Sequence, residues 1–144
     1  PLKACLRVLA ATRFARSLSV QIAAGADILP ALQVSAEISS HPALEDTIAG
    51  CKSALTNGRS LSLSLDTTKF FPRLFVQMVA VGEECGAVSD LLSRTADLYE
   101  QALDSALESL TSLVEPLVIG GMGVIVGIFV LATMMPIGQL LQKL

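Results

Sequence analysis

A long apolar segment near the C-terminus constrains what this chain can fold into more than any other feature. No charged residue occurs between Glu115 and Lys143, and Leu117 to Met135 are apolar or glycine apart from Thr133. This length is close to the roughly 20 residues that a helix needs to cross the hydrocarbon core of a bilayer. A helix buried inside a soluble protein seldom needs so long an uninterrupted apolar run. The segment therefore predicts a transmembrane helix that anchors a single domain.

The predicted span also contains glycines at helical spacing, among them Gly120, Gly123 and Gly127. In a helix exposed to water each glycine costs about 1 kcal/mol relative to alanine. In membrane helices, by contrast, small residues let two backbones approach closely, and Gly123 and Gly127 form a G-x-x-x-G pair of this kind. We favour packing against another membrane helix; the alternative is that these glycines only loosen the span.

Helical patterns dominate the rest of the chain and predict an all-α fold. Glycine, proline and capping residues mark the ends of the helices. The signals predict helices over residues 2–24, 28–38 and 42–57, a fourth from about residue 72 to 82 or 86, and a last one from 88 into the span. The motif "SLSLSL" at residues 60–65 alternates as a strand would, but it is short and could equally be a helical turn. We predict a helical domain at residues 1–113, a membrane helix at 114–138 and a short tail at 139–144.

The last helix carries apolar residues at alternating spacings of four and three, a heptad pattern that predicts burial against another helix. The positions are Leu92, Ala96, Tyr99, Leu103, Ala106, Leu110, Leu113 and Leu117. Pro116 and Pro136 flank the apolar core of the span, where each can kink the helix.

Acidic residues follow another face of the same helix. This acidic stripe is either a solvated face or a docking surface for a basic partner or a divalent cation. Glu83 and Glu84, before the helix, have no evident local partner, so one of them bonds across the turn or to another protein. The candidate partner contacts are Glu83, Glu84, Asp97, Glu100, Asp104 and Glu108.

Composition and motifs argue against several classes of function. The net charge is -3, and basic residues interleaved with aromatic ones are missing, so nucleic-acid binding is not expected. Three widely spaced cysteines and one histidine predict free thiols in a reducing compartment and no metal site. The sequence has no phosphate-binding loop, nucleophile elbow or H-E-x-x-H motif. We therefore predict a protein without a cofactor that is not an enzyme.

Three stretches of the sequence resemble the type II secretion F domain family, the GspF/PilC inner-membrane platform proteins. They are "RFARSLSVQIAAG" at residues 13–25, "FPRLFVQMVAVGEECGAVSDLL" at 71–92 and "YEQALDSALESLTSLVEPL" at 99–117. Gly82, Glu83 and Gly86 match the family's G-E-x-S-G-x-L signature, while Cys85 stands in place of its serine and Val88 in place of its leucine. Gly82 and Gly86 form a helix-turn motif, which is either a structural hinge or a contact site.

The resemblance implies an antiparallel six-helix bundle whose long last helix continues into a transmembrane helix. Family members carry two such domains and three membrane spans, and this chain resembles the second domain with the last span. The family's topology implies a domain in the cytoplasm of a bacterial cell, a span in the inner membrane and a periplasmic C-terminus. The basic residues Lys3, Arg7, Arg13 and Arg16 agree with a cytoplasmic face.

The function implied by the resemblance is that of a platform protein in type IV pilus assembly or type II secretion. Such a protein couples a hexameric assembly ATPase in the cytoplasm to the polymerisation of pilins or pseudopilins. The expected partners are this ATPase, the pilins, other inner-membrane assembly proteins, the membrane and further copies of the chain. The wording of the motifs favours the pilus branch. The alternative is a membrane-tethered helical adaptor or regulatory module, in which the span is only an anchor.

Overall fold

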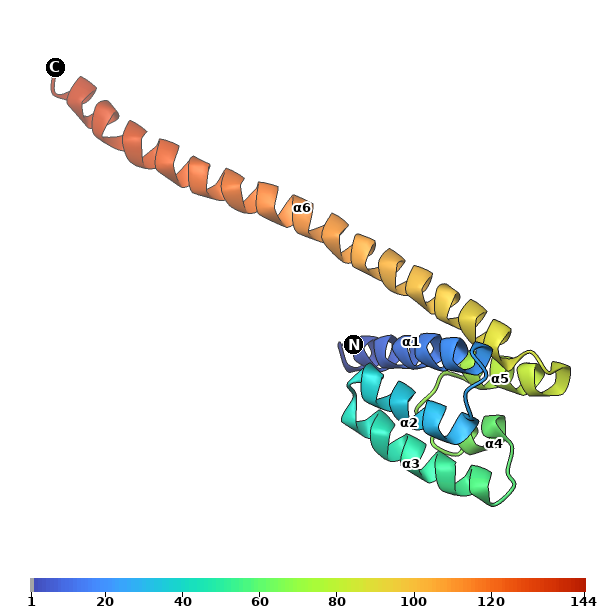
Figure 1. Ribbon diagram of the computed structural model, residues 1–144. Helices are drawn as coiled ribbons and strands as arrows, with labels where there is room; N and C mark the ends of the chain where they lie inside the picture. The colour runs from blue at the N-terminus through green and yellow to red at the C-terminus, as the bar shows by residue number, and fades with distance from the viewer. Residues whose placement is uncertain (1) are drawn as a thin grey trace. The chain divides into compact units, whose positions relative to one another are not determined.

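The computed structural model describes residues 2–144, and every regular element in that range is an α-helix (Figure 1). The helices are α1 (Leu2–Ala23), α2 (Ile28–Ser39), α3 (Pro42–Thr56), α4 (Leu61–Asp66), α5 (Arg73–Cys85) and α6 (Val88–Gln142). The predicted fold, a bundle of six helices with a long apolar last helix, is confirmed. The motif at residues 60–65 forms most of α4 and is therefore helical.

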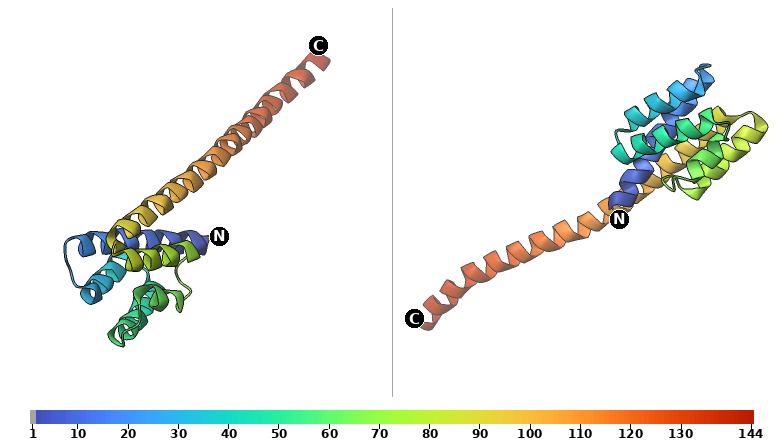
Figure 2. Two further views of the ribbon diagram at one scale, coloured as in Figure 1. Left: turned by 90° about the vertical axis from the view of Figure 1, so that its right-hand side faces the viewer. Right: turned by 90° about the horizontal axis from the view of Figure 1, so that it is seen from below.

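The sequence signals for helix ends coincide with the observed ends. Gly25, two residues after the end of α1, adopts a φ of +83°, a left-handed conformation that glycine tolerates at little cost. Pro42 occupies the first turn of α3, where its missing N–H is not needed by the helix. These short turns let consecutive helices pack side by side, α1 on α2, α2 on α3, α3 on α4 and α4 on α5 (Figures 1 and 2).

The core of the bundle is built around three phenylalanine rings. Phe71 and Phe75 stack with ring centroids 4.5 Å apart, and Phe14 lies 5.3 Å from Phe71. Such pairs add about 0.5–1.5 kcal/mol each beyond the apolar area that they bury. Around them every helix contributes fully buried aliphatic side chains, which are Leu18, Leu32, Leu44, Ile48, Leu65, Val79 and Leu92.

Cys51 belongs to this core and is not a reactive thiol. Its Sγ donates a hydrogen bond to the carbonyl oxygen of Ser64 at 3.2 Å. Burial raises the pKa of the Cys51 thiol to about 11, because the thiolate would be desolvated. Cys5 and Cys85 are exposed. All three are free thiols, as predicted from their spacing.

The chain forms two units, one up to Leu103 and the other from Asp104 to Leu144, and α6 contributes to both. The first unit is the bundle, in which α6 buries Leu92, Thr95 and Ala96. The second unit consists of the remainder of α6, whose side chains are exposed throughout. Within residues 2–144, α6 is the one helix long and apolar enough to cross a membrane. Its helical assignment continues through Pro116 and Pro136.

The heptad pattern on α6 is buried over only half of its predicted length. Leu92 and Ala96 are fully buried, and Tyr99 and Leu103 are half-buried in the bundle. The four later positions, Ala106, Leu110, Leu113 and Leu117, are exposed. Burial within the described chain therefore ends near Leu103, and burial of the later positions against another helix stays a prediction.

Candidate functional site

The turn between α5 and α6 is closed by two glycines, as the helix-turn motif predicts. Gly86 follows α5 with a φ of +66°, in the left-handed region that favours glycine. The N–H groups of Gly86 and Ala87 both donate to the carbonyl oxygen of Gly82, the latter at 2.9 Å. The Ala87 bond is the 6→1 bond of a Schellman motif and the Gly86 bond is the 5→1 bond of an αL cap, and both satisfy a carbonyl at the C-terminal end of a helix.

Gly82 has a second role, because the backbone of α6 begins against it. A Cβ atom at Gly82 would lie 2.8 Å from the Cα and 3.2 Å from the backbone nitrogen of Val88. Both atoms belong to the main chain, so no side-chain rotation could relieve the contact. Only glycine at this position lets α6 start where it does. The close contact supports the structural reading of the motif, and its role as a hinge rather than a contact site stays a prediction.

Glu83 is half-buried in the bundle and caps the short helix α4. Its Oε1 accepts from the backbone N–H of Leu61 at 2.6 Å. Its Oε2 accepts from the N–H of Ser62 at 3.1 Å and from the Ser62 hydroxyl at 2.6 Å. The next free N–H, that of Leu63, donates to the Ser60 hydroxyl. A negative charge at this position also stabilises the positive end of the helix dipole.

This network settles which local partner Glu83 has, and it distinguishes Glu83 from its neighbour. The sequence could not reveal the partner, because more than 20 residues separate Glu83 from Leu61 and Ser62. Glu84 is exposed. As a candidate for contact with another protein, Glu84 is thus the more available of the two, whereas Glu83 fixes α4 to α5.

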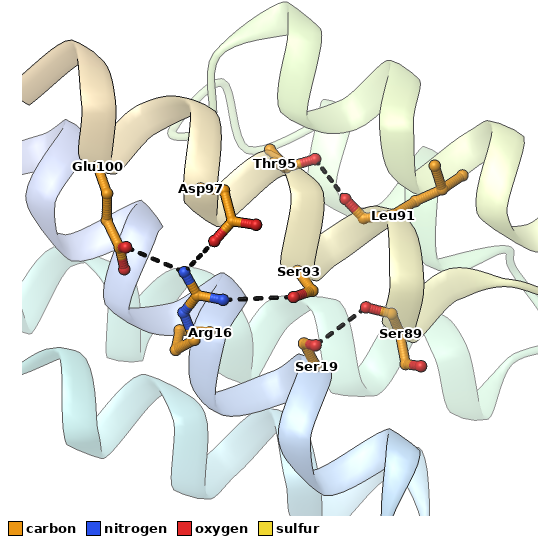
Figure 3. A network of polar contacts seen from close by, with 8 residues as sticks. All are labelled: Arg16, Ser19, Ser89, Leu91, Ser93, Thr95, Asp97 and Glu100. Carbon is orange, nitrogen blue, oxygen red and sulfur yellow. Dashed lines mark hydrogen bonds and ion pairs between the residues drawn. The ribbon is translucent and has the colours of Figure 1, made fainter.

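Arg16 of α1 joins the first turns of α6 to the bundle through polar contacts (Figure 3). Its guanidinium donates to Asp97, to Glu100 at 3.0 Å and to the Ser93 hydroxyl at 3.3 Å. Hydrogen bonds to Asp97 and then to Glu100 raise the pKa of Arg16. One turn further along α1, the Ser19 hydroxyl donates to the carbonyl oxygen of Ser89 at 2.9 Å. Together these contacts orient α6 antiparallel to α1 within the bundle.

The acidic stripe predicted from the sequence is consequently divided. Asp97 and Glu100 pair with Arg16. Asp104 and Glu108 are exposed and belong to the unit that begins at Asp104. Among residues 2–144, no three His, Cys, Asp or Glu side chains are grouped as metal ligands would be. The part of the stripe that remains open to a partner is its C-terminal half.

The glycines of the predicted span are open to their surroundings. An added Cβ atom at Gly120, Gly123 or Gly127 would meet no atom within 4 Å, apart from the backbone of α6 itself. The backbone is therefore accessible along this face of α6. Packing of this face against another membrane helix stays a prediction.

Removing the Arg16 contacts is expected to have a moderate effect on stability. We expect Arg16→Ala to lower the free energy of unfolding by about 1 kcal/mol, because half-exposed ion pairs are weak and screened by salt. The measurement is urea unfolding of the chain in neutral detergent at low and high salt. Arg94→Ala, at an exposed position of α6, is the matched control. Equal losses in both variants, or no dependence on salt, would contradict a role for the ion pairs.

An all-α bundle closed by a Gly-Glu-x-x-Gly turn, with a last helix able to cross a membrane, defines a class of helical proteins with a candidate membrane anchor. A family model described as "Type II secretion system (T2SS), protein F" matches residues 14–136. The match includes the bundle helices and the apolar part of α6. The chain therefore belongs to this family, as its resemblance to the family signature predicted.

Characterised relatives of the chain are named for both pilus assembly and secretion. The chain is 37% identical to the type IV pilus assembly protein PilC of Myxococcus xanthus over 94% of its length. It is 36% identical to the PilC protein of Pseudomonas aeruginosa over 91% of its length. It is 39% identical to the type II secretion system protein F of Xanthomonas campestris, over 71% of its length. The matches cover 32%, 35% and 26% of these relatives, so the chain spans about a third of their length or less.

Proposed function

We propose that this chain is part of an inner-membrane platform protein that couples a cytoplasmic assembly ATPase to the polymerisation of pilins or pseudopilins. The observation that carries the proposal is the family match at residues 14–136, which includes the bundle and the apolar helix together. In this proposal the bundle faces the cytoplasm, the apolar part of α6 crosses the inner membrane and the C-terminus is periplasmic.

The mechanism that we propose relies on α6. Its first turns are fixed in the bundle by buried side chains and by Arg16, and its later residues form the apolar segment. The helical assignment has no interruption between these two parts. Apart from Pro116, which has no N–H to donate, the residues of this part can each make the helical hydrogen bond, and a helix resists bending more than a loop does. A displacement of the bundle by an ATPase would thus be passed to the membrane segment.

The surfaces for the proposed partners follow from which residues are already engaged. Glu83, Asp97 and Glu100 serve contacts within the bundle, which leaves Glu84, Asp104 and Glu108 as exposed acids for the ATPase or another assembly protein. Gly120, Gly123 and Gly127 would face pilins, further copies of the chain or the other membrane helices of the assembly.

Deletion of the gene in the native bacterium tests the proposed process and its branch. Surface pili and twitching are scored beside secreted exoproteins in the same cells. We expect loss of pili with secretion intact, because the first relatives matched are pilus assembly proteins. Loss of exoproteins with pili intact would assign the chain to secretion. Survival of both, in the absence of a second gene copy, would overturn the proposal.

Breaking α6 between its two parts tests the coupling itself. Leu110 is exposed, so its side chain supports no packing in the described chain. Leu110→Pro removes a backbone hydrogen bond and clashes with the preceding turn. We expect it to abolish assembly, whereas Leu110→Ala should be tolerated. Both proteins must be present at wild-type levels in the membrane fraction. Undiminished assembly in Leu110→Pro would refute transmission through a rigid helix.

A membrane-tethered adaptor is the second candidate function. It is favoured because the unit from Asp104 onward consists of a single helix. For a tether, any helix that crosses the membrane would suffice. Replacing the segment that holds Gly120, Gly123 and Gly127 with a polyleucine helix distinguishes the two. A tether should remain functional after the replacement, whereas a platform whose span packs against other helices should fail.

A further inference from the structure

A cavity of about 350 Å³ lies between the first turns of α1 and the segment that joins α4 to α5. From α1 it is lined by Ala4, Arg7 and Val8, and from the joining segment and the start of α5 by Lys69, Phe70, Phe71, Pro72 and Arg73. The lining belongs wholly to the bundle and includes none of the acidic residues or glycines considered above. It has two chemical features, three cations and an apolar floor.

The three cations of the cavity have no acidic neighbour in its lining. The guanidinium of Arg7 donates to the carbonyl oxygens of Lys69 and Phe70, at 2.7 and 2.9 Å. These bonds hold it in place without neutralising its charge. Within residues 2–144, both ion pairs are made by Arg16, so Arg7, Lys69 and Arg73 have no carboxylate partner there. The lining of the cavity therefore carries three cations and no acid on a chain whose net charge is -3, and the nearby Asp66 lies in a neighbouring pocket that Arg73 also lines.

The floor of the cavity is aromatic and closely packed. Phe70 and Phe71 are 7% and 6% exposed, and their rings meet edge to face at 5.3 Å. The Arg7 guanidinium lies over the Phe70 ring, 5.2 Å from its centroid, and the His41 ring contacts the same ring. A cation placed over a ring in this way is attracted by the negative face of the ring. The Phe70 ring is thus held by contacts with Arg7, His41 and Phe71.

The backbone at Lys69 points to a function for its side chain. Lys69 has a φ of +50°, in the left-handed region where glycine, asparagine and aspartate are favoured. A lysine in this conformation makes the fold less stable than glycine, asparagine or aspartate would at the same position. Such strained positions are found preferentially at functional sites. Lys69 lines the cavity as its third cation.

We propose that this cavity is a docking site for an acidic segment of a partner protein, which places an apolar or aromatic side chain on the phenylalanine floor between the three cations. Carboxylates on either side of that side chain would pair with Arg7, Lys69 and Arg73. Arginine is suited to this task because its planar group can bind a carboxylate through two hydrogen bonds. This docking site goes beyond the proposed function, since it holds whether or not the partner is an ATPase.

The shape of the site favours a peptide over a bilayer or a nucleic acid. Membrane surfaces are recognised by clusters of about four to eight basic residues, and they need no apolar floor beneath them. Nucleic-acid sites combine a longer basic groove with exposed aromatic faces on which bases stack. Here three cations surround a small concave surface whose rings are largely buried. A peptide with one apolar side chain flanked by acidic residues matches both the three cations and the apolar floor of the cavity.

Binding of a designed peptide to the purified chain in neutral detergent tests the proposal. The probe is a fluorescently labelled Glu-Asp-Phe-Asp-Glu peptide, followed by anisotropy. Two comparison peptides separate the contributions: Gln-Asn-Phe-Asn-Gln removes the charge, and Glu-Asp-Gly-Asp-Glu removes the ring. We expect saturable binding of the first peptide and a loss of about tenfold in affinity for each of the others, which corresponds to about 1.4 kcal/mol.

Variants place the binding in the cavity. Lys69→Asn with Arg73→Gln should weaken the peptide about tenfold or more, whereas Arg59→Gln with Arg94→Gln, an equal change of charge at exposed positions elsewhere, should not. Lys69→Asn alone should also weaken binding of the peptide. The melting temperature of this variant should equal or exceed that of the unchanged chain, because asparagine tolerates the left-handed conformation. That combination separates a lost contact from a damaged fold.

Three outcomes would overturn the proposal. The first is no saturable binding of the acidic phenylalanine peptide. The second is equal weakening by the cavity and control variants, which would indicate a diffuse effect of charge. The third is displacement of the peptide by short-chain phosphatidylglycerol, with the same sensitivity to Lys69→Asn, which would make the cavity a lipid site. Because the measurement uses the isolated chain, none of these results depends on pilus assembly or secretion.

Discussion

Gly82→Ala is expected to destabilise the bundle by about 3 kcal/mol, the upper end of what overpacking of a core costs. The new Cβ would lie 2.8 Å from the Val88 Cα, and only a shift of the main chain could relieve this contact. Val88 begins α6, and Leu92 and Ala96 of the same helix are buried in the core. The shift would therefore displace these two side chains from their places in the core. Chemical unfolding of the chain in neutral detergent, followed by circular dichroism, measures the loss.

The control for this substitution is another helical glycine with open space. Gly50 lies inside α3, and an added Cβ there would meet no atom within 4 Å. Gly50→Ala is therefore expected to stabilise the chain by about 0.5–1 kcal/mol, the ordinary difference in helix propensity. Similar changes in both variants would show that the close approach at Gly82 does not determine stability.

Helix ends were the part of the fold that the sequence predicted best. α1 and α3 end two residues before Gly25 and Gly58, α5 ends directly before Gly86, and all three glycines have a positive φ. These signals are local, since a left-handed backbone favours glycine whatever surrounds it. The sequence predicted the apolar segment of α6 equally well, because no charged residue interrupts it.

The motif at residues 60–65 shows where a local pattern leaves two answers. Alternating serine and leucine suits a strand, but Leu61 and Leu65 are four residues apart and also share one face of a helix. In α4 these two are buried and Leu63 is 61% exposed. The choice of a helix depends on caps from Ser60 and from Glu83, and the second comes from a different part of the chain.

The sequence alone could not tell which of the acidic candidate contacts are engaged within the bundle and which are exposed. All six acids look alike in a linear pattern, yet Arg16 pairs with Asp97 and Glu100 from more than 80 residues away. The heptad pattern likewise continues to Leu117, although burial in the described chain ends near Leu103. Periodicity reports which face of a helix is apolar, and it does not report where the neighbouring helix ends.

The role of Glu83 leads to the second large effect. We expect Glu83→Ala to lower the free energy of unfolding by about 2–4 kcal/mol, since three donors at the start of α4 lose a charged acceptor in a partly buried place. A helix of six residues cannot compensate through its own length. Chemical unfolding measures the loss, and hydrogen exchange at Leu61 and Ser62 should accelerate together.

Two further variants separate capping from charge. Glu84→Ala removes the same charge at an exposed position and should change stability by less than about 0.5 kcal/mol. Glu83→Gln keeps one carbonyl oxygen, but its amide group cannot accept from Ser62, so its loss should lie between those of the other two variants. If Glu83→Ala were as stable as Glu84→Ala, the cap would not hold α4 in place. The match of Glu83 to the family signature would then have to come from contacts with a partner.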